Sequence, residues 1–220
     1  MKTQTVIIAL VALLFSIAAF SLAPHPANAQ EYAGQRYFGV SIGQTKDDPD
    51  YCDDDSIATW TNCPDKDTGV KFYVGHNLHK NFAVEAGFID FGEFKPKFAF
   101  DDRGRINRGL IKISGNSLFV AGMGKVHVHP KANLFGKIGL HRWDIETGIG
   151  WEEPGRWPPQ PDVDDDGVDL FYGIGGEVAP FSNEKVKLRV EYEMFTADDF
   201  NNSGSDIDFE FISVGVIYAF

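Results

Sequence analysis

Apolar and charged side chains alternate without a break in the stretch Val186-Lys187-Leu188-Arg189-Val190-Glu191-Tyr192-Glu193-Met194. A period of two is typical of a β-strand, whose successive side chains point to opposite faces. One face of this strand is therefore apolar and the other is charged. In a soluble β-barrel the apolar face would point inward, whereas in a membrane barrel it faces lipid and the charged face lines the lumen. The alternation alone does not choose between these two arrangements.

Similar alternation recurs along the chain and predicts eight strands. We expect them at residues 36–44, 68–76, 81–93, 109–128, 132–146, 168–179, 185–196 and 207–220. The connections between them are alternately long and short, which is typical of outer-membrane barrels, with their short periplasmic turns and long extracellular loops. The sequence therefore predicts an all-β fold, an eight-stranded antiparallel up-and-down transmembrane β-barrel with both termini on the periplasmic side.

The last predicted strand favours the membrane arrangement. Val214, Val216, Tyr218 and Phe220 share one face, and Phe220 is the final residue. A lipid-facing strand that ends in the aromatic belt of a membrane barrel has this pattern. Glycine is also frequent on the predicted strands, which indicates crowding or sharp curvature. A soluble lipocalin-like barrel with its apolar faces inward is the alternative.

The start of the chain has the pattern of an export signal. Lys2 precedes an apolar run from Val6 to Phe20, and an Ala-x-Ala cleavage site ends at Ala29. This pattern predicts a signal peptide at residues 1–29. Residues 30–220 contain no second long apolar run, so we expect them to cross a bilayer only as a closed barrel, in the outer membrane of a Gram-negative cell.

Short motifs in a fixed order add a family resemblance. They are Tyr37-Phe38-Gly39-Val40-Ser41-Ile42-Gly43, Ala83-Val84-Glu85-Ala86-Gly87-Phe88, Leu134-Phe135-Gly136-Lys137-Ile138-Gly139-Leu140-His141-Arg142-Trp143, Asp166-Gly167-Val168-Asp169-Leu170-Phe171-Tyr172-Gly173-Ile174-Gly175 and Tyr218-Ala219-Phe220. Together they make the chain resemble the transmembrane domain of the OmpA family, the small outer-membrane β-barrel proteins. The resemblance implies that Tyr218 and Phe220 belong to the signal that the barrel-assembly machinery reads during insertion.

The predicted inward face carries five basic and four acidic residues, a nearly balanced set. They are Lys71, Glu85, Lys125, Lys137, Glu177, Lys187, Arg189, Glu191 and Glu193. Burial of an unpaired ion is costly, so these groups must pair or keep water. We interpret them as a lumen ion-pair cluster, which acts either as a structural plug or as a gate that opens when partners switch. The resemblance implies Glu85, Lys137, Glu177 and Arg189 as members of such a gate.

The long connections carry the other candidate sites. Residues 45–67 are rich in Asp, and we predict a local disulfide between Cys52 and Cys63 in an oxidising compartment. Asp162, Asp164 and Asp166 match the opening of a calcium loop, but Gly173 stands where the twelfth-position Glu is required. These residues form either a solvated acidic loop without a bound ion or a loop that loosely associates with Ca²⁺. No other cofactor is expected.

Charge also bears on the partners. The formal net charge of −12 argues against a nucleic-acid partner. The connection at residues 94–108 is locally basic, with Lys95, Lys97, Arg103, Arg105 and Arg108, which suits the phosphates of lipopolysaccharide or marks an ordinary charged loop. We expect outer-membrane lipid, lipopolysaccharide and the barrel-assembly machinery as partners, while the sequence does not identify a surface ligand.

The sequence does not predict an enzyme. His127 and His129 lie two residues apart, but no acid or Cys nearby completes a metal site, and we interpret His141 as structural. An outer-leaflet lipid enzyme would need Ser, His and an acid together at the rim. We therefore expect a structural or surface-interaction role, in envelope integrity, adhesion or ligand contact through acidic extracellular loops. A narrow gated pore for ions or small solutes and a lipid-modifying enzyme are the alternatives.

Overall fold

The computed structural model of the chain describes residues 34–47, 59–101, 105–151, 161–181, 185–200 and 205–220. The predicted signal peptide and Cys52 lie outside these residues. The described part is built of antiparallel strands, and no helix within it has the length and hydropathy that a membrane crossing needs. The strands are β1 (Arg36–Asp47), β2 (Thr59–Asn62), β3 (Lys66–His79), β4 (Phe82–Phe94), β5 (Lys97–Asp101), β6 (Ile106–His129), β7 (Ala132–Trp151), β8 (Val163–Val178), β9 (Val186–Phe200) and β10 (Ser205–Ala219).

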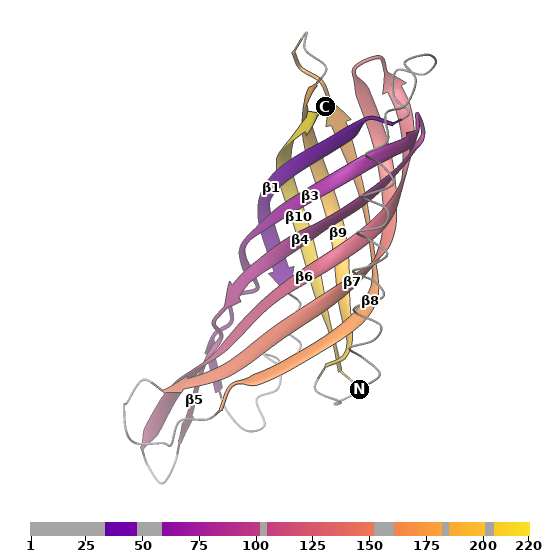
Figure 1. The fold of residues 1–220 in the computed structure, drawn as a ribbon. Coiled ribbons are helices and arrows are strands. Elements are labelled where there is room, and N and C mark those ends of the chain that lie inside the picture. Colours follow the sequence, from indigo (N-terminus) through magenta and orange to yellow (C-terminus); the bar gives the residue numbers. More distant parts are fainter. Residues whose placement is uncertain (1–33, 48–58, 102–104, 152–160, 182–184, 201–204) are drawn as a thin grey trace, which may run out of the picture. The chain divides into compact units, whose positions relative to one another are not determined.

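Eight of these strands form a closed ring (Figure 1). Their order is β6-β4-β3-β1-β10-β9-β8-β7, and pairing of β7 with β6 closes the circle. All neighbours are antiparallel, and β1 pairs with β10 from Tyr37↔Ala219 to Asp47↔Phe209. The predicted eight-stranded barrel is thereby confirmed. A closed ring leaves no unpaired edge within it, which is what a membrane-spanning sheet requires.

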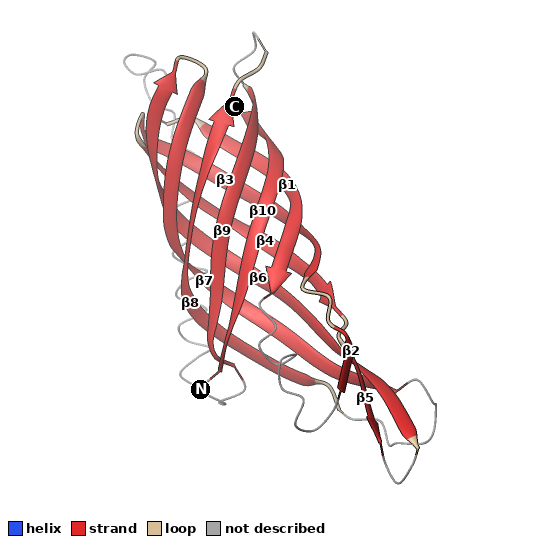
Figure 2. Cartoon of the chain, turned by 180° about the vertical axis from the view of Figure 1, so that it is seen from behind, coloured by secondary structure: helices blue, strands red, loops and turns tan. Residues whose placement is uncertain are grey.

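Two further strands correct the sequence-based prediction. β2 and β5 lie in segments that we predicted as polar loops, and β5 pairs with the start of β6 from Lys97↔Leu110 to Asp101↔Ile106. Figure 2 shows both strands beside the far end of β6. Moreover, β7 runs to Trp151 and β8 begins at Val163, so both strands reach into the predicted loop at residues 147–167. Outside lipid a strand needs no apolar outer face. These strand ends carry charged residues, and for that reason the sequence pattern did not identify them as strands.

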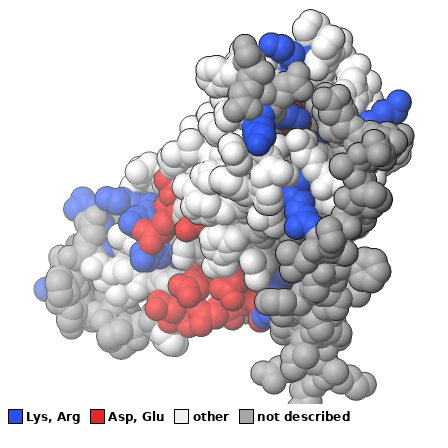
Figure 3. All heavy atoms as spheres, turned by 45° about the horizontal axis from the view of Figure 1, so that its top comes forward, with Lys and Arg blue, Asp and Glu red and all other residues white. Residues whose placement is uncertain are grey.

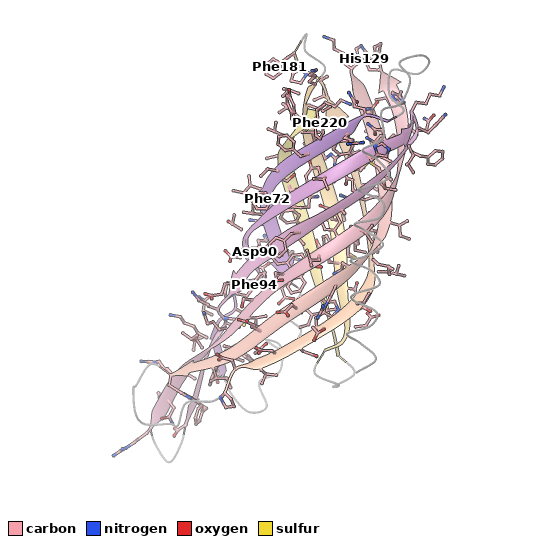
Figure 4. All side chains as sticks on the ribbon, viewed as in Figure 1. Phe72, Asp90, Phe94, His129, Phe181 and Phe220 are labelled. Carbon is pink, nitrogen blue, oxygen red and sulfur yellow. The ribbon has the colours of Figure 1, made fainter. Side chains whose placement is uncertain are left out.

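The two ends of the barrel differ in their connections. The end with the β3–β4, β6–β7 and β8–β9 turns is called the short-turn end, and the opposite end is called the long-connection end. Figure 4 shows His129, Phe181 and Phe220 together at the short-turn end, with Phe94 far from them. β6, β7 and β5 extend farthest at the long-connection end (Figure 1).

The barrel wall is apolar outside and partly charged inside. Val74 is 60% exposed and Ile174 is 64% exposed, whereas Lys71 and Arg189 are 0% and 1% exposed. Phe72 projects from the outer wall in Figure 4. A soluble barrel would show the reverse pattern, so the lipocalin-like alternative is wrong. Along most of each strand, the period that the sequence predicted assigns side chains alternately to the lipid-facing wall and to the lumen.

Candidate functional site

The structure brings the nine charged residues of the predicted cluster into the lumen. They come from β3, β4, β6, β7, β8 and β9. All nine have odd residue numbers, and in these parts of the strands the odd-numbered side chains face the lumen. Eight of them are buried, and the side chain of Lys187 is 15% exposed. We call these nine residues the charged layer. They fill the half of the lumen nearer the short-turn end.

Arg189 is the central cation of one half of this layer. Its Nη1 donates to Glu85 Oε1 at 2.5 Å, and its Nη2 donates to Glu177 Oε1 at 2.5 Å. One guanidinium therefore joins β9 to β4 on one side and to β8 on the other. Lys125 and Lys187 contact Glu177 more loosely, at 3.6 and 3.9 Å.

Two lysines and two glutamates form the other half. Lys137 Nζ lies 2.5 Å from Glu191 Oε1 and 2.7 Å from Glu193 Oε1. Lys71 pairs with the same two carboxylates from the opposite wall. Each of these carboxylates therefore contacts more than one cation. Such sharing satisfies buried charges better than isolated pairs would.

Tyrosine rings, which the sequence did not predict as members, complete the charged layer. The Tyr37 hydroxyl donates to Glu85 Oε1 at 2.8 Å, and the Arg189 guanidinium lies 4.7 Å from the centre of the Tyr73 ring. Each ring packs over a glycine of the neighbouring strand, where a larger residue would leave no room for it. A Cβ on Gly75 would stand 2.1 Å from the Tyr37 ring, and one on Gly39 would stand 2.2 Å from the Tyr73 ring.

A second layer of the lumen is apolar. Seven buried phenylalanines lie toward the long-connection end, and we call them the aromatic layer: Phe91, Phe94, Phe119, Phe171, Phe195, Phe209 and Phe211. Phe171 stacks on Phe195 with ring centroids 4.6 Å apart, and Phe91 lies 5.2 Å from Phe195. The lumen is therefore occupied by two consecutive layers of different chemistry. Sequence reasoning predicted only the first.

A β-bulge positions two of these rings. The register between β4 and β6 shifts between Asp90 and Gly92, and Gly92 has a φ of 89°. A bulge with glycine in the left-handed region adds one residue to the strand. As a result, both Phe91 and Phe94 are buried, at 1% exposure each. Without the extra residue, an odd–even alternation would send one of them outward.

The aromatic layer also encloses a serine and a histidine. Ser117 Oγ lies 3.0 Å from His141 Nδ1, and His141 Nε2 lies 2.9 Å from the carbonyl oxygen of Thr196. Both side chains are buried, and the imidazole packs edge-on against Phe195 at 5.2 Å. The pair joins β6, β7 and β9 across the lumen. This geometry agrees with a structural role for His141, because burial closes the pair off from solvent.

Beyond the ring, a small sheet projects at the long-connection end. It comprises β2, β5, residues 106–112 of β6 and residues 148–151 of β7, and we call it the extension. Its inner face carries a cluster of partly exposed rings, Trp60, Phe98, Phe100 and Trp151. Its outer face carries exposed Lys97, Arg108 and Lys112, and exposed Asp101 lies on the same face. Lys112 Nζ lies 2.6 Å from Glu93 Oε2, and Lys95 pairs with the same carboxylate.

The predicted calcium residues are not brought together as a loop. Asp164 and Asp166 lie on β8 and share an exposed outer face, while Asp162 precedes the strand. Asp166 accepts a hydrogen bond from Arg142 at 3.0 Å and stands opposite Asp144. No group of three or more His, Cys, Asp or Glu residues in the described ranges is arranged to hold a metal ion. Calcium association stays a prediction.

The remaining predicted residues lie at the two ends. Cys63 is disulfide-bonded, and Cys52, its predicted partner, lies outside the described residues. Tyr218 and Phe220 point outward at the short-turn end, where the Tyr218 ring lies 5.7 Å from that of Phe38. Their role in assembly stays a prediction.

A closed antiparallel ring with a lipid-compatible outer wall and a charged lumen defines an outer-membrane β-barrel. The chain matches the outer membrane protein beta-barrel domain family over residues 8–220, and it belongs to that family. The resemblance predicted from the motifs is confirmed at this level. A comparison with curated proteins found no match.

Solved structures of other outer-membrane barrels align with the chain at low sequence identity. Neisserial surface protein A aligns with a TM-score of 0.51 at 10% identity, covering 84% of this chain and 97% of that one. Ail, the attachment invasion locus protein of Yersinia pestis, aligns with a TM-score of 0.46 at 13% identity, covering 84% and 98%. The N-terminal β-barrel domain of Pseudomonas aeruginosa OprF aligns at 0.48 and 8% identity, covering 84% and 97%. At 10% identity the likeness to Neisserial surface protein A concerns the fold alone.

Proposed function

We propose that the chain is a closed, non-conducting outer-membrane barrel that anchors an interaction surface outside the cell. The observation that carries this proposal is the filled lumen. A solute would have to pass the ion pairs of the charged layer and then the stacked rings of the aromatic layer. Even if the ion pairs exchanged partners, the aromatic layer would still lie in series with them. An eight-stranded barrel has little interior space beyond what side chains fill.

The proposal includes an orientation. We place the short-turn end in the periplasm, with both termini of the barrel, and the long-connection end outside the cell. Outer-membrane barrels have short periplasmic turns and long extracellular connections. The extension, with its charged outer face and its partly exposed rings, would then project beyond the outer leaflet.

Lipopolysaccharide is the partner that we propose for the outer face of the extension. Lys97, Arg108 and Lys112 point the same way as the lipid-facing wall of β6, on which Leu118 is exposed. They therefore lie along the surface next to the lipid, beyond its apolar part. Phosphate groups of the outer leaflet accept charge-assisted hydrogen bonds from such cations. The acidic residues elsewhere at this end leave adhesion or contact with a cationic ligand as further roles of the same surface.

Planar-bilayer recording tests the closed lumen. We expect bilayers to stay electrically silent at a high load of folded protein, with folding verified by a shift in gel migration upon boiling. Step-like conductance from the unaltered protein would contradict the proposal and favour a pore gated by the ion pairs.

The lipopolysaccharide contact has its own test. We expect the variant Lys97→Gln/Lys112→Gln to retain less lipopolysaccharide than the unaltered protein when barrels are purified from outer membranes in mild detergent. Lys80→Gln/Lys131→Gln removes the same charge from the short-turn end and serves as the control. Equal retention by the first variant would contradict the contact, and a loss confined to the control would reverse the proposed orientation.

We also propose that the barrel is not an enzyme. The pair Ser117 and His141 is buried among phenylalanine rings, so a lipid substrate has no route to it through the described residues. Incubation of the folded barrel with lipid A, followed by mass spectrometry, tests this point. We expect the lipid to stay intact, and a deacylated product would contradict the proposal.

A further inference from the structure

Two of the tight turns at the short-turn end share one hydrogen-bond pattern. In the β3–β4 turn, the amide of Asn81 donates to His79 Nδ1 at 3.3 Å. In the β6–β7 turn, the amide of Lys131 donates to His129 Nδ1 at 3.2 Å, and Figure 4 shows His129 at this end of the barrel. Each histidine is the last residue of its strand and stands two positions before the amide. An imidazole therefore fills the role that an Asn or Asp side chain often has in a turn.

Each of these turns also binds the next strand of the ring. The carbonyl oxygen of Asn81 accepts from the Lys125 amide on β6 at 2.8 Å, and the Asn81 side chain donates to the Lys125 carbonyl oxygen at 2.8 Å. The carbonyl oxygen of Lys131 accepts from the amide of Ala179, just after β8, at 2.9 Å. The residue that donates to the imidazole is thus the same residue that joins the turn to a neighbouring strand. The two histidines therefore help to hold the rim of the barrel together.

This pattern requires a particular protonation state of both rings. A ring nitrogen that accepts a hydrogen bond carries no proton, so the one proton of the neutral imidazole is on Nε2 in His79 and in His129. Acid adds a second proton to the ring, on Nδ1, and this atom then becomes a donor. The turn amide would face another N–H group and lose its acceptor. Histidine takes up this proton between about pH 8 and pH 5.

Charged groups around the two turns influence the pH at which the imidazoles take up a proton. No residue from 76 to 82 or from 126 to 133 is Asp or Glu, and the large red patch of Figure 3 lies at the other end of the molecule. The charged and titratable groups on the surrounding elements are Arg36 on β1, His76 on β3, Lys80 and Lys131 in the turns, Glu85 on β4, Lys125 and His127 on β6, Glu177 on β8, Lys185 before β9 and, outside the described residues, Glu184. These charges shift the pH of protonation, whereas the loss of the acceptor follows from protonation itself.

We infer that protonation of His79 and His129 in acid releases the turn amides that they hold and loosens the junctions of the two turns with β6 and β8. The rim at the short-turn end is therefore sensitive to pH. The ring itself stays closed, because continuous backbone ladders join β4 to β6 and β7 to β8 beyond the turns. The inference rests on the hydrogen bonds of these turns and not on the closed lumen, the orientation or the lipopolysaccharide contact.

Amide hydrogen exchange provides the test. The barrel is folded in detergent, and NMR measures the protection of the Asn81 and Lys131 amides at about pH 8 and about pH 5, corrected for the intrinsic pH dependence of exchange. We expect the corrected protection to fall about fivefold in acid, which is the effect of one net hydrogen bond. The amides of Ala219 and Phe220 donate to carbonyl oxygens on the same rim, and we expect their protection to stay unchanged. Equal corrected protection of the turn amides at both pH values would overturn the inference.

Nitrogen NMR of the two imidazoles checks the hydrogen bonds themselves. At about pH 8 we expect the proton on Nε2 and an unprotonated Nδ1 in both His79 and His129. A proton on Nδ1 at this pH would mean that neither ring accepts from its turn amide, and the inference would be wrong.

Two variants locate the pH dependence. His79→Asn/His129→Asn keeps a side-chain acceptor for the turn amide but removes the titrating ring, so we expect the same protection at both pH values. His79→Ala/His129→Ala removes the acceptor, and we expect low protection at both. The shift in gel migration upon boiling verifies that each variant has folded. If the asparagine variant kept the pH dependence of the unaltered protein, the effect would come from another group, such as His127, and the inference would be overturned.

Discussion

Phe91 stacks on Phe209 with ring centroids 4.6 Å apart and an interplanar angle of 10°. The two rings come from β4 and β10, which are separated in the ring by β3 and β1. This contact therefore spans the lumen and does not join neighbouring strands. It makes the aromatic layer a packed core inside the barrel, comparable to the interior of a soluble domain.

We expect Phe91→Ala to lower the free energy of unfolding by about 3–5 kcal/mol, because it leaves a cavity in a packed interior. Urea titration of the barrel folded in vesicles, followed by tryptophan fluorescence, measures this change. Phe72→Ala is the control, since Phe72 is 52% exposed on the lipid-facing wall, where lipid can fill the space. Equal losses in the two variants would mean that the inner rings are not tightly packed.

The sequence predicted the charged layer but not the aromatic layer, although both follow from the same alternation. On β9 the inward positions Arg189, Glu191 and Glu193 continue to Phe195, and on β10 they include Phe209 and Phe211. Continuing the alternation would have identified these rings. Phe94 is different, because it lies beyond the bulge at Gly92, which breaks the alternation, and no residue pattern marks where a register shifts.

Strand ends beyond the lipid were also harder to predict than the ring. Alternation identified all eight strands of the ring because lipid imposes an apolar outer face on each of them. β2 has only the residues Thr59–Asn62. β5 has only the residues Lys97–Asp101, with a charged residue at each end and apolar residues between them. Their pairing depends on the distant end of β6, which a local pattern does not contain.

The pairing of Arg189 with two carboxylates gives the second prediction. We expect Arg189→Met to lower the free energy of unfolding by about 3–5 kcal/mol, because it leaves buried Glu85 and Glu177 without their closest cation. The same urea titration measures the loss. Lys187→Met is the matched control, because Lys187 is partly exposed and lies 3.9 Å from Glu177. We expect this control to cost less than about 1 kcal/mol. A similar loss in both variants would show that the short contacts of Arg189 add no more stability than the looser contact of Lys187.

Glycine positions under tyrosine rings give the third prediction. We expect Gly75→Ala to destabilise the barrel by about 1–3 kcal/mol, because the new methyl group would stand 2.1 Å from the Tyr37 ring and force it to move. Gly122→Ala is the control, since a Cβ at Gly122 has nothing within 4 Å. Thermal unfolding of both variants in the same detergent measures the difference. If the two alanine variants were equally stable, glycine at residue 75 would not be required by the ring.

The last prediction concerns the outer face of the extension. Hydrogen bonds from Lys112 and Lys95 hold the pKa of the Glu93 carboxyl below its usual value. A carboxyl whose pKa is lowered by folding adds stability above its unfolded pKa, and this stability is lost as the pH falls through the lowered pKa.

We expect Lys112→Gln to raise the pKa of Glu93 toward its usual value, because it removes the partner with the largest effect. A ¹³C NMR titration of the Glu93 carboxyl in detergent-solubilised barrel measures the shift. Lys46→Gln, whose amine lies 3.9 Å from Glu210, is the control and should leave the pKa of Glu93 unchanged. A pKa of Glu93 that does not respond to Lys112→Gln would mean that this pair does not persist in solution, and the extension would then present free lysines to the phosphates of the outer leaflet.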